Sequence, residues 1–258
     1  MEYDRFAGVF GVWAATAGST AANRAFYLEA YRTAAPGPVV ELGVGDGRLV
    51  VEAVRAGRDI WGVEGSAAML DLCRVRAEAE GVSDRLHLLH ADFARFELPE
   101  PATLVTMPYH TMPHLLERET KLAVLRHIHD QLRPGGQFLY DDFVITPERL
   151  SAMREVQLRA RYRNDEGQDT LFWVTSLVDE ASQRIQAMTW EDVLDDHGVL
   201  VRRQYRPLTF SWLTPAQSEA LLVEAGFRIE ACWGDFRRSP FDEASAEEQV
   251  WLVSRKAS

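Results

Sequence analysis

Residues 38–47 read PVVELGVGDG, a short apolar run that ends in a glycine-rich turn. The apolar run predicts a buried strand, and the apolar spacing from Leu49 to Ala56 predicts a helix directly after the turn. Glycine adopts the positive φ angles of tight turns and lets a ligand approach the backbone closely. A strand, a glycine turn and a helix in this order indicate a ligand-binding βα unit.

The alternation of strand and helix continues to about residue 144. We expect further strands over residues 59–63, 87–90, 103–107 and 137–140, and helices over residues 66–80 and 118–132. Arg133-Pro134-Gly135-Gly136 should stop the last of these helices and turn the chain. Strands that alternate with helices predict parallel βαβ units with right-handed crossovers, so the fold class is α/β with a doubly wound sheet.

The pattern changes beyond residue 149. Strands in meander order are expected over residues 171–178, 184–194 and 199–210, and they predict an antiparallel β insertion that acts as a lid over the carboxyl edge of the sheet. A helix from Thr214 to Ala225 and strands over 227–234 and 248–255 close the chain. The expected domains are an irregular aromatic arm with a helix (1–35), a cofactor-binding core (36–150), the insertion or lid (151–211) and a C-terminal helix with the closing strand pair (212–258).

Charge narrows the classes of partner. The 258 residues include 28 Lys and Arg against 39 Asp and Glu, a net charge of −11. That field repels phosphate backbones and anionic membranes, so a nucleic-acid substrate is disfavoured, and the arginines of residues 154–163 are interpreted as a solvated face. No apolar run approaches the roughly 20 residues of a membrane span. Cys73 and Cys232 are interpreted as buried thiols of a reducing compartment, and we expect a cytoplasmic protein.

Two acidic residues follow the next expected strands. Glu64 ends the second strand, where a carboxylate can accept both hydroxyls of a ribose. Asp92 and Phe93 follow the third strand, where the carboxylate can accept a hydrogen bond from an exocyclic amine and the ring can stack on a base. Arg48 stands where a dinucleotide fingerprint has its third glycine, which argues against a nicotinamide oxidoreductase.

Together these motifs resemble the class I S-adenosylmethionine-dependent methyltransferases over residues 36–145. The resemblance rests on Glu-x-Gly-x-Gly-x-Gly at residues 41–47, the two acidic positions and Leu-Arg-Pro-Gly-Gly at 132–136. It implies a Rossmann-like, mostly parallel sheet of seven strands with an antiparallel last strand, and S-adenosyl-L-methionine as cofactor. Residues 107–115 (MPYHTMPHL) and 233–236 (WGDF) are similar to a bacterial small-molecule subgroup related to the N-methyltransferases of amino sugars and glycine.

The resemblance implies a set of cofactor-binding residues. They are Tyr3, Glu41, Gly43, Gly45, Gly47, Glu64, Gly65, Met69, Asp92, Phe93 and Met107. In that set Glu41 lies under the methionine amino group, Glu64 binds the ribose and Asp92 holds the adenine amine. Thr106 and Met107 would face the methionine moiety. Tyr3 would close over the cofactor carboxylate, and Phe10 stands where a second tyrosine is expected.

The chemistry expected is an in-line displacement at a carbon that a sulfonium activates, in which alignment supplies much of the catalysis. A base is needed only if the acceptor must lose a proton. His110 and His114 follow the fourth strand, and both imidazoles face one side if the chain turns into a helix there. Asp141 and Asp142 end the fifth strand, and one of them is expected to cap a helix before Pro147.

The candidate catalytic residues are therefore His110, His114 and Asp142, and no metal is expected although these three side chains could hold one. Tyr109, His110, Trp190 and Trp233 are the candidate substrate-binding residues. We expect methyl transfer to N or O of a small-molecule metabolite in biosynthesis, by a protein that could form a homodimer. The alternatives are an S-adenosylmethionine-binding regulator or assembly partner without transferase activity, and an RNA methyltransferase.

Overall fold

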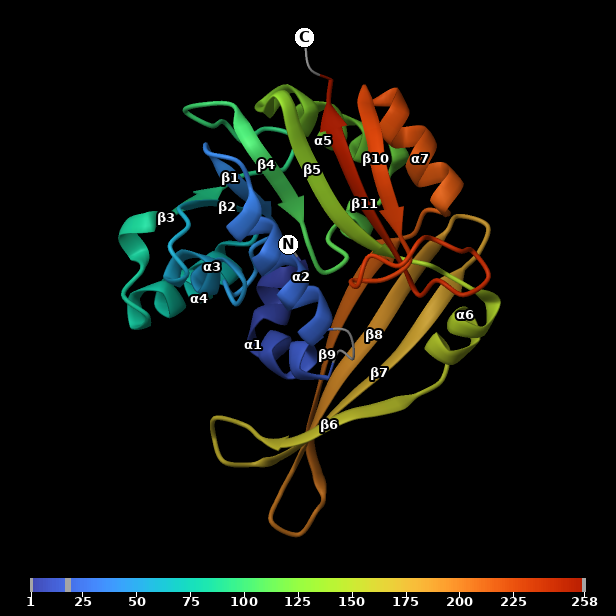
Figure 1. Cartoon of the computed structure of the whole chain (residues 1–258). Coiled ribbons are helices and arrows are strands. Elements are labelled where there is room, and N and C mark those ends of the chain that lie inside the picture. The colour runs from blue at the N-terminus through green and yellow to red at the C-terminus, as the bar shows by residue number, and fades with distance from the viewer. Residues whose placement is uncertain (1, 17–19, 257–258) are drawn as a thin grey trace. The chain divides into compact units, whose positions relative to one another are not determined.

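A computed structural model of the chain describes residues 2–16 and 20–256, apart from the side chain of Thr20 (Figure 1). The chain forms two compact units. The smaller unit contains residues 1–18 and 145–212, and the larger unit contains residues 19–144 and 213–258. No helix in the described ranges combines the length and the apolar character that a bilayer span requires.

The larger unit is built on a seven-stranded sheet in the order β10-β11-β5-β4-β1-β2-β3. The strands are β1 (Val39–Leu42), β2 (Ile60–Glu64), β3 (Leu86–His90), β4 (Ala102–Met107), β5 (Leu132–Phe143), β10 (Phe227–Trp233) and β11 (Glu248–Arg255). Strands β1 to β5 pair in parallel, whereas β11 is antiparallel to both β5 and β10. The expected Rossmann-like sheet with an antiparallel last strand is confirmed.

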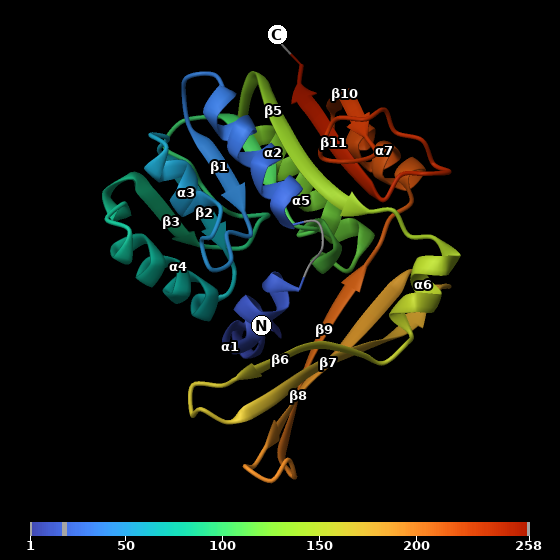
Figure 2. The ribbon, with the colours of Figure 1, turned by 60° about the horizontal axis from the view of Figure 1, so that its bottom comes forward.

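Helices cover both faces of this sheet. They are α2 (Thr20–Thr33), α3 (Val50–Arg55), α4 (Ala67–Ala79), α5 (Arg118–Gln131), α7 (Pro215–Glu224) and the single turns η1 (Ser83–Arg85) and η2 (Met112–His114). Val39 packs in the apolar cluster of α2, α3 and α4, whereas Val40 packs in the cluster of α5 and α7, as the alternation of side chains along a strand requires. Figure 2 shows α2 and α5 on opposite faces, so the sheet is doubly wound.

The start of β5 differs from the expectation. The sequence Arg133-Pro134-Gly135-Gly136 ends α5 as predicted, but it lies inside the strand instead of forming a separate turn. Pairing with β4 passes from Ala102 opposite Leu132 to Leu104 opposite Gln137, so the extra residues form a bulge. Gly135 has a φ of +75° in this bulge, a conformation that glycine adopts without strain.

The smaller unit contains a four-stranded antiparallel sheet in the order β6-β7-β8-β9. Its elements are α1 (Glu2–Ala15), α6 (Pro147–Met153), β6 (Gln157–Arg163), β7 (Asp169–Asp179), β8 (Arg184–Leu194) and β9 (Leu200–Ser211). The antiparallel insertion is confirmed, and its role as a lid stays a prediction. The strand β6 was not expected. It is an edge strand whose exposed Arg161 and Arg163 carry the charge that protects such edges, so the solvated-face interpretation holds for these side chains.

The expectation of an irregular arm before residue 21 is wrong for the described residues 2–15. They form α1, which buries Phe6 and Val9 against Phe172 and Leu208 of the antiparallel sheet. Phe6, Val9 and Trp13 recur at helical spacing, so the signal was present in the sequence. The next helix, α2, agrees with the helix expected within residues 1–35, over residues 21–34, and belongs to the larger unit.

Candidate functional site

Acidic and polar side chains line the carboxyl edge of the seven-stranded sheet. In sheet order they are Glu248 of β11, Asp141 of β5, Thr106 of β4, Glu41 of β1 and Glu64 of β2. Ligands of open α/β sheets bind outside this edge, where the strand order reverses, and here the reversal falls between β4 and β1. Glu248 reaches the same edge because β11 runs antiparallel, so its first residue lies where its neighbour β5 ends.

The glycine turn after β1 is tightly packed. Gly43 and Gly47 have φ angles of +77° and +78°. A Cβ at Gly43 would lie 2.8 Å from Cγ2 of Thr111, and one at Gly47 would lie 2.6 Å from Sγ of Cys73. Gly45 also has a positive φ, of 56°, and its amide points at Glu64. The turn therefore requires glycine at positions 43 and 47 and presents bare backbone at the edge of the sheet.

Glu64 is held rigidly beside the turn. Its Oε2 accepts from the Gly45 amide at 3.1 Å and its Oε1 from the Ser66 amide at 2.9 Å. A carboxylate oxygen has two acceptor positions, so a carboxylate can accept from hydroxyls as well as from amides. A carboxylate fixed at this place fits the ribose role that the resemblance implies for Glu64. Met69 is buried in the first turn of α4, and the Gly65 carbonyl lies 3.0 Å from Nε2 of His90.

Glu41 is buried at the end of β1. The hydroxyl of Tyr31 on α2 donates to its Oε2 at 2.5 Å and also lies 2.9 Å from Oγ1 of Thr106. Burial raises the pKa of Glu41 to about 8, although the hydrogen bond from Tyr31 and the charge of Arg48 act in the opposite direction. A cation beside Glu41 would restore its charged form, so the residue fits the amino group of a methionine moiety.

Asp92 and Phe93 lie beyond β3. Asp92 is exposed, and its Oδ1 accepts from the Ala94 amide at 2.8 Å, so it also holds its own turn. Phe93 is half-buried and packs against the apolar cluster that contains Val63. Met107 is fully buried in the same cluster. The cofactor roles of these residues stay predictions.

The loop after β4 is strained and is held by Asp141. Tyr109 and His110 have φ angles of 58° and 55°, which are costly for residues other than glycine. Their amides each donate to a different oxygen of Asp141 at 3.1 Å, and the hydroxyl of Tyr27 donates to Oδ1 at 2.5 Å. Asp141 is fully buried, and it fixes the loop where the candidate base stands.

The imidazole of His110 lies among side chains from two neighbouring strands. Its Nε2 is 2.7 Å from Oε2 of Glu248 and 3.5 Å from Oδ2 of Asp141, and its ring stacks on Phe143 at a centroid distance of 3.6 Å. Burial opposes the charged form, but the hydrogen bond and charge of Glu248, with the charges of Asp141 and Asp142, outweigh it and raise the pKa of His110. The site therefore contains an imidazole tied to a carboxylate.

Asp142 has other neighbours. Side chains alternate along β5, so Asp142 points to the face of α5, away from Asp141 and Phe143. Its Oδ1 accepts from the Phe143 amide at 2.7 Å, and burial raises its pKa to about 7 against the opposing charges of His110 and Lys121. The catalytic candidate at the end of β5 that contacts His110 is thus Asp141. Asp142 stays a prediction without such a contact.

Two further expectations about this region need correction. Neither aspartate caps the helix before Pro147, because Oγ1 of Thr146 accepts from the Arg149 amide at 3.2 Å and fills that role. His110 and His114 do not share a helical face: His110 lies in the strained loop, and His114 lies in the single turn η2, outside the cluster around Asp141.

Tyr109 remains a substrate-binding candidate. The guanidinium of Arg48 lies 4.0 Å from the centroid of its ring, and its buried hydroxyl has no hydrogen-bond partner in the described part of the chain. Burial raises the pKa of Tyr109 to about 12, so the hydroxyl remains a donor at neutral pH. An unpartnered buried donor beside the glycine turn is suited to a polar group of a ligand.

The other aromatic candidates pack against aromatic neighbours. Trp233 is half-buried and packs edge-on against Phe26 in the apolar cluster of α2, which is a core position. Trp190 lies in the smaller unit and stacks on Trp173 at 6.2 Å. Tyr3 also lies in the smaller unit, where it meets Phe6 edge-on. Contact of Trp190 and Tyr3 with ligands stays a prediction.

The cluster of His110, Asp141 and Glu248 fits a hydrogen-bonded network better than a metal site. His110, Asp141 and Glu248 offer atoms within 4.8 Å of one another, as a small metal site would. The oxygens of Asp141, however, already accept three hydrogen bonds.

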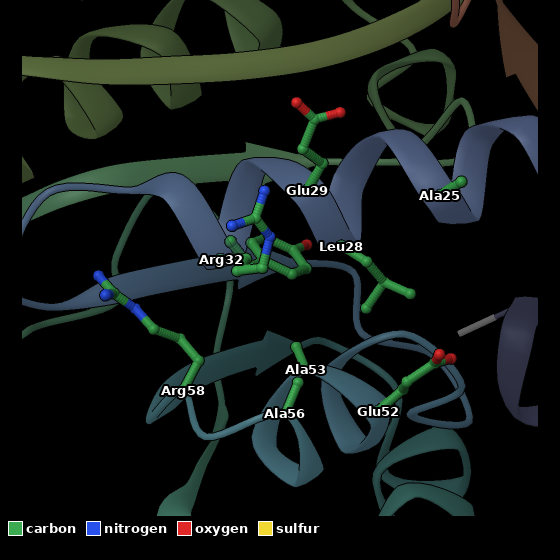
Figure 3. A pocket seen from close by; sticks show the side chains of 9 residues that line it. Ala25, Leu28, Glu29, Arg32, Glu52, Ala53, Ala56 and Arg58 are labelled. Atoms are coloured by element: carbon green, nitrogen blue, oxygen red, sulfur yellow. The ribbon is translucent and has the colours of Figure 1, made fainter.

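A separate groove of about 390 Å³ lies between α2 and α3 (Figure 3). Leu28, Arg32, Glu52 and Ala53 are among its lining residues, and none of the expected cofactor residues lines it.

Sequence reasoning missed three residues of the site. Tyr27 and Tyr31 are one turn apart on α2, so both reach the sheet from the same helix face, but no sequence motif marks them. Glu248 did have a signal. An antiparallel last strand must begin at the edge where the parallel strands end, so the first residue of that strand was a candidate.

The fold and the edge define an α/β domain that binds a nucleoside-containing cofactor. Residues 39–136 match a family model described as a methyltransferase domain. This stretch of the chain is therefore similar to methyltransferase domains, and its motifs resemble those of the S-adenosylmethionine-dependent class. An uncharacterized methyltransferase of Geobacillus kaustophilus is 31% identical over 132 residues, which are 51% of this chain and 58% of that protein. The chain spans little more than half the length of this curated relative.

Solved structures match a larger share of the chain. The CcbJ methyltransferase of Streptomyces caelestis is 25% identical with a TM-score of 0.75, over 92% of this chain and 90% of that one. CalS10, an amino pentose methyltransferase of Micromonospora echinaspora solved with S-adenosylmethionine, is 19% identical with a TM-score of 0.70, over 96% and 97%. An S-adenosylmethionine-dependent methyltransferase of Clostridium acetobutylicum is 15% identical with a TM-score of 0.77, over 99% of each chain. The last two matches show the fold.

Proposed function

We propose that this protein transfers the methyl group of S-adenosyl-L-methionine to a nitrogen or oxygen of a small-molecule metabolite. The observation that carries the proposal is the arrangement of Glu41, the glycine turn and Glu64 along one edge of a methyltransferase-domain sheet. The cofactor supplies a methyl carbon that its sulfonium activates. The residues of this chain bind and orient the reactants and accept a proton where the acceptor must lose one.

Each part of the edge has a task in this proposal. The glycine turn brings bare backbone to the cofactor, and Glu64 accepts from its ribose hydroxyls. Glu41 gains its charge beside the methionine ammonium. His110 follows β4, the neighbour of β1, and its imidazole contacts side chains of β5 and β11. It is our candidate proton acceptor. Holding donor and acceptor in line is the larger catalytic contribution.

Nitrogen is the acceptor atom that we favour. Asp141 and Glu248 lie beside His110, Asp142 adds its charge from the other face of β5, and carboxylates attract an ammonium whereas they repel a phenolate. CalS10 is described as an amino pentose methyltransferase and supports the same class of acceptor. We further propose a role in biosynthesis in the cytoplasm, which agrees with the two free thiols of Cys73 and Cys232.

The test is methyl transfer from S-adenosylmethionine carrying a ¹³C methyl group to a panel of amino sugars, small amines and phenols. Mass spectrometry should find a labelled product and S-adenosylhomocysteine in equal amounts, and no product when the acceptor is omitted. Binding of the cofactor without transfer to any acceptor would favour the regulator or assembly partner. RNA is added to the same panel. Transfer of the ¹³C methyl group to RNA and to none of the small molecules would favour the RNA methyltransferase.

A further inference from the structure

The carboxylate of Glu248 and the imidazole of His110 meet because of the sheet register. Glu248 stands opposite Phe143 in the antiparallel pair of β11 and β5, so the two side chains share a face. Asp141 precedes Phe143 by two residues and lies on the same face. His110 stacks on Phe143 and lies 2.7 Å from Glu248 through Nε2. The position of the imidazole is thus fixed by two strands and by a loop that Asp141 holds.

The contact with Glu248 determines which nitrogen carries the proton. An ionised carboxylate only accepts hydrogen bonds, so Nε2 must be the donor in this pair. In the neutral imidazole the lone pair then lies on Nδ1. No described residue forms a hydrogen bond with Nδ1, and the His110 side chain keeps 15% of its exposure. The Glu248 side chain is 8% exposed, so little water competes for the contact.

We propose that Glu248 is a positioning residue, which holds His110 as the Nε2–H tautomer and leaves Nδ1 to accept the proton of the methyl acceptor. This inference rests on the proposed function. In the step, the N–H or O–H bond of the acceptor breaks and its proton passes to Nδ1. The freed electron pair forms the bond to the methyl carbon while the carbon–sulfur bond breaks, and sulfur keeps that electron pair. The products are the methylated acceptor, S-adenosylhomocysteine and an imidazolium paired with Glu248.

Titratable groups lie near His110 on each neighbouring element. The groups are Glu248 on β11, Asp141 and Asp142 on β5, Tyr27 on α2, Tyr109 in the same loop and Lys121 on α5. Among the residues that the structure describes, only Glu248 forms a side-chain hydrogen bond with the imidazole, so its removal should change the tautomer and the titration together.

The test is an NMR titration of full-length protein labelled with ¹⁵N-histidine, with His110→Gln used to assign the His110 signals. Ring nitrogen shifts distinguish the two neutral tautomers directly. The wild type should show the Nε2–H form and titrate above the ordinary histidine value of about 6.5. Glu248→Gln should lower the pKa by about one unit or more, and Glu247→Gln, at an exposed position next in the chain, should leave it unchanged.

Several results would overturn the inference. One is an Nδ1–H tautomer in the wild type, a measurement that does not depend on how well any variant folds. Another is a folded Glu248→Gln protein, with a native circular dichroism spectrum, in which the tautomer and titration of His110 are unchanged. A third is a stoichiometric shift of the His110 signals on addition of Zn²⁺ alone, which would make the cluster a metal site.

Calorimetry with S-adenosylmethionine on the same samples separates this inference from the proposed function. A wild type that does not bind the cofactor would contradict the function and leave the tautomer result as a property of the fold. A wild type that binds the cofactor but carries the Nδ1–H tautomer would contradict only the role of Glu248.

Discussion

At the scale of single residues, the most informative group is Glu41, a carboxyl that lies in the core with a tyrosine as its donor. Burial raises its pKa to about 8, so at pH 7 it is mostly protonated. A folded-state pKa above the unfolded value of the group also means that its contribution to stability is lost as the pH rises toward 8. A bound ammonium would lower that pKa, because an opposite charge nearby favours the ionised form.

Binding of S-adenosylmethionine at pH 7 should therefore release up to one proton from Glu41. Calorimetry in buffers with different ionisation enthalpies measures this release, and the affinity should rise between pH 6 and 8 and then level off. Glu41→Gln should remove this part of the proton release, whereas Glu78→Gln, at an exposed position on α4, should preserve it. A heat of binding that is the same in every buffer for the wild type would contradict the prediction.

Gly47 gives a second prediction at this scale. Gly47→Ala adds a Cβ 2.6 Å from Sγ of the buried Cys73 and places alanine at a φ of +78°. We expect a loss of roughly 1–3 kcal/mol in the free energy of unfolding from the backbone strain, with a further loss from the clash. Urea denaturation measures it. Gly57→Ala shares the positive φ but meets no atom within 4 Å, so an equal loss in both variants would show that the clash contributes nothing.

At the scale of elements, α7 shows how local sequence determines a boundary. Thr214 and Gln217 form a capping box, in which Oγ1 of Thr214 accepts from the Gln217 amide at 3.3 Å and Oε1 of Gln217 accepts from the Thr214 amide at 2.8 Å. Both bonds are local in sequence, so the start of this helix was predictable. The strand that follows, β10, was expected over nearly the same residues.

Thr214→Ala should lower the free energy of unfolding by about 1 kcal/mol, because the Gln217 amide at the start of α7 loses its acceptor. For a chain of this size that is a fall in Tm of roughly 2–4 °C, measurable by calorimetry. Glu219→Ala on an exposed position of the same helix is the control. A Tm for Thr214→Ala that equals that of the control would contradict the capping role.

Elements that depend on partners were harder to predict. The strand β6 does alternate, with Leu158, Ala160 and Tyr162 between arginines, but its arginines led to the interpretation as a solvated face alone. The bulge at Arg133–Gly136 depends on the register with β4, which the sequence does not reveal. The helix α1 had the right spacing, and its aromatic content led to the wrong interpretation.

At the scale of the whole molecule, the site in the larger unit is a product of strand order. The cofactor half was predictable because Glu41, Gly45 and Glu64 follow consecutive strands, and parallel strands end at one edge. The contact between His110 and Glu248 joins residues 138 positions apart and depends on an antiparallel pairing register. Sequence spacing carries no information about such a contact, so His110 was found and its carboxylate partner was not.

The central claim is that the carboxyl edge of this sheet binds S-adenosylmethionine through its ribose, and calorimetric titration of the wild type and Glu64→Gln tests it most directly. Hydrogen bonds to a charged group contribute about 1.5–3 kcal/mol, so the variant should bind more weakly by roughly tenfold to a hundredfold, with the same stoichiometry as the wild type. Equal affinity in the two proteins, or no binding of S-adenosylmethionine by the wild type, would contradict it.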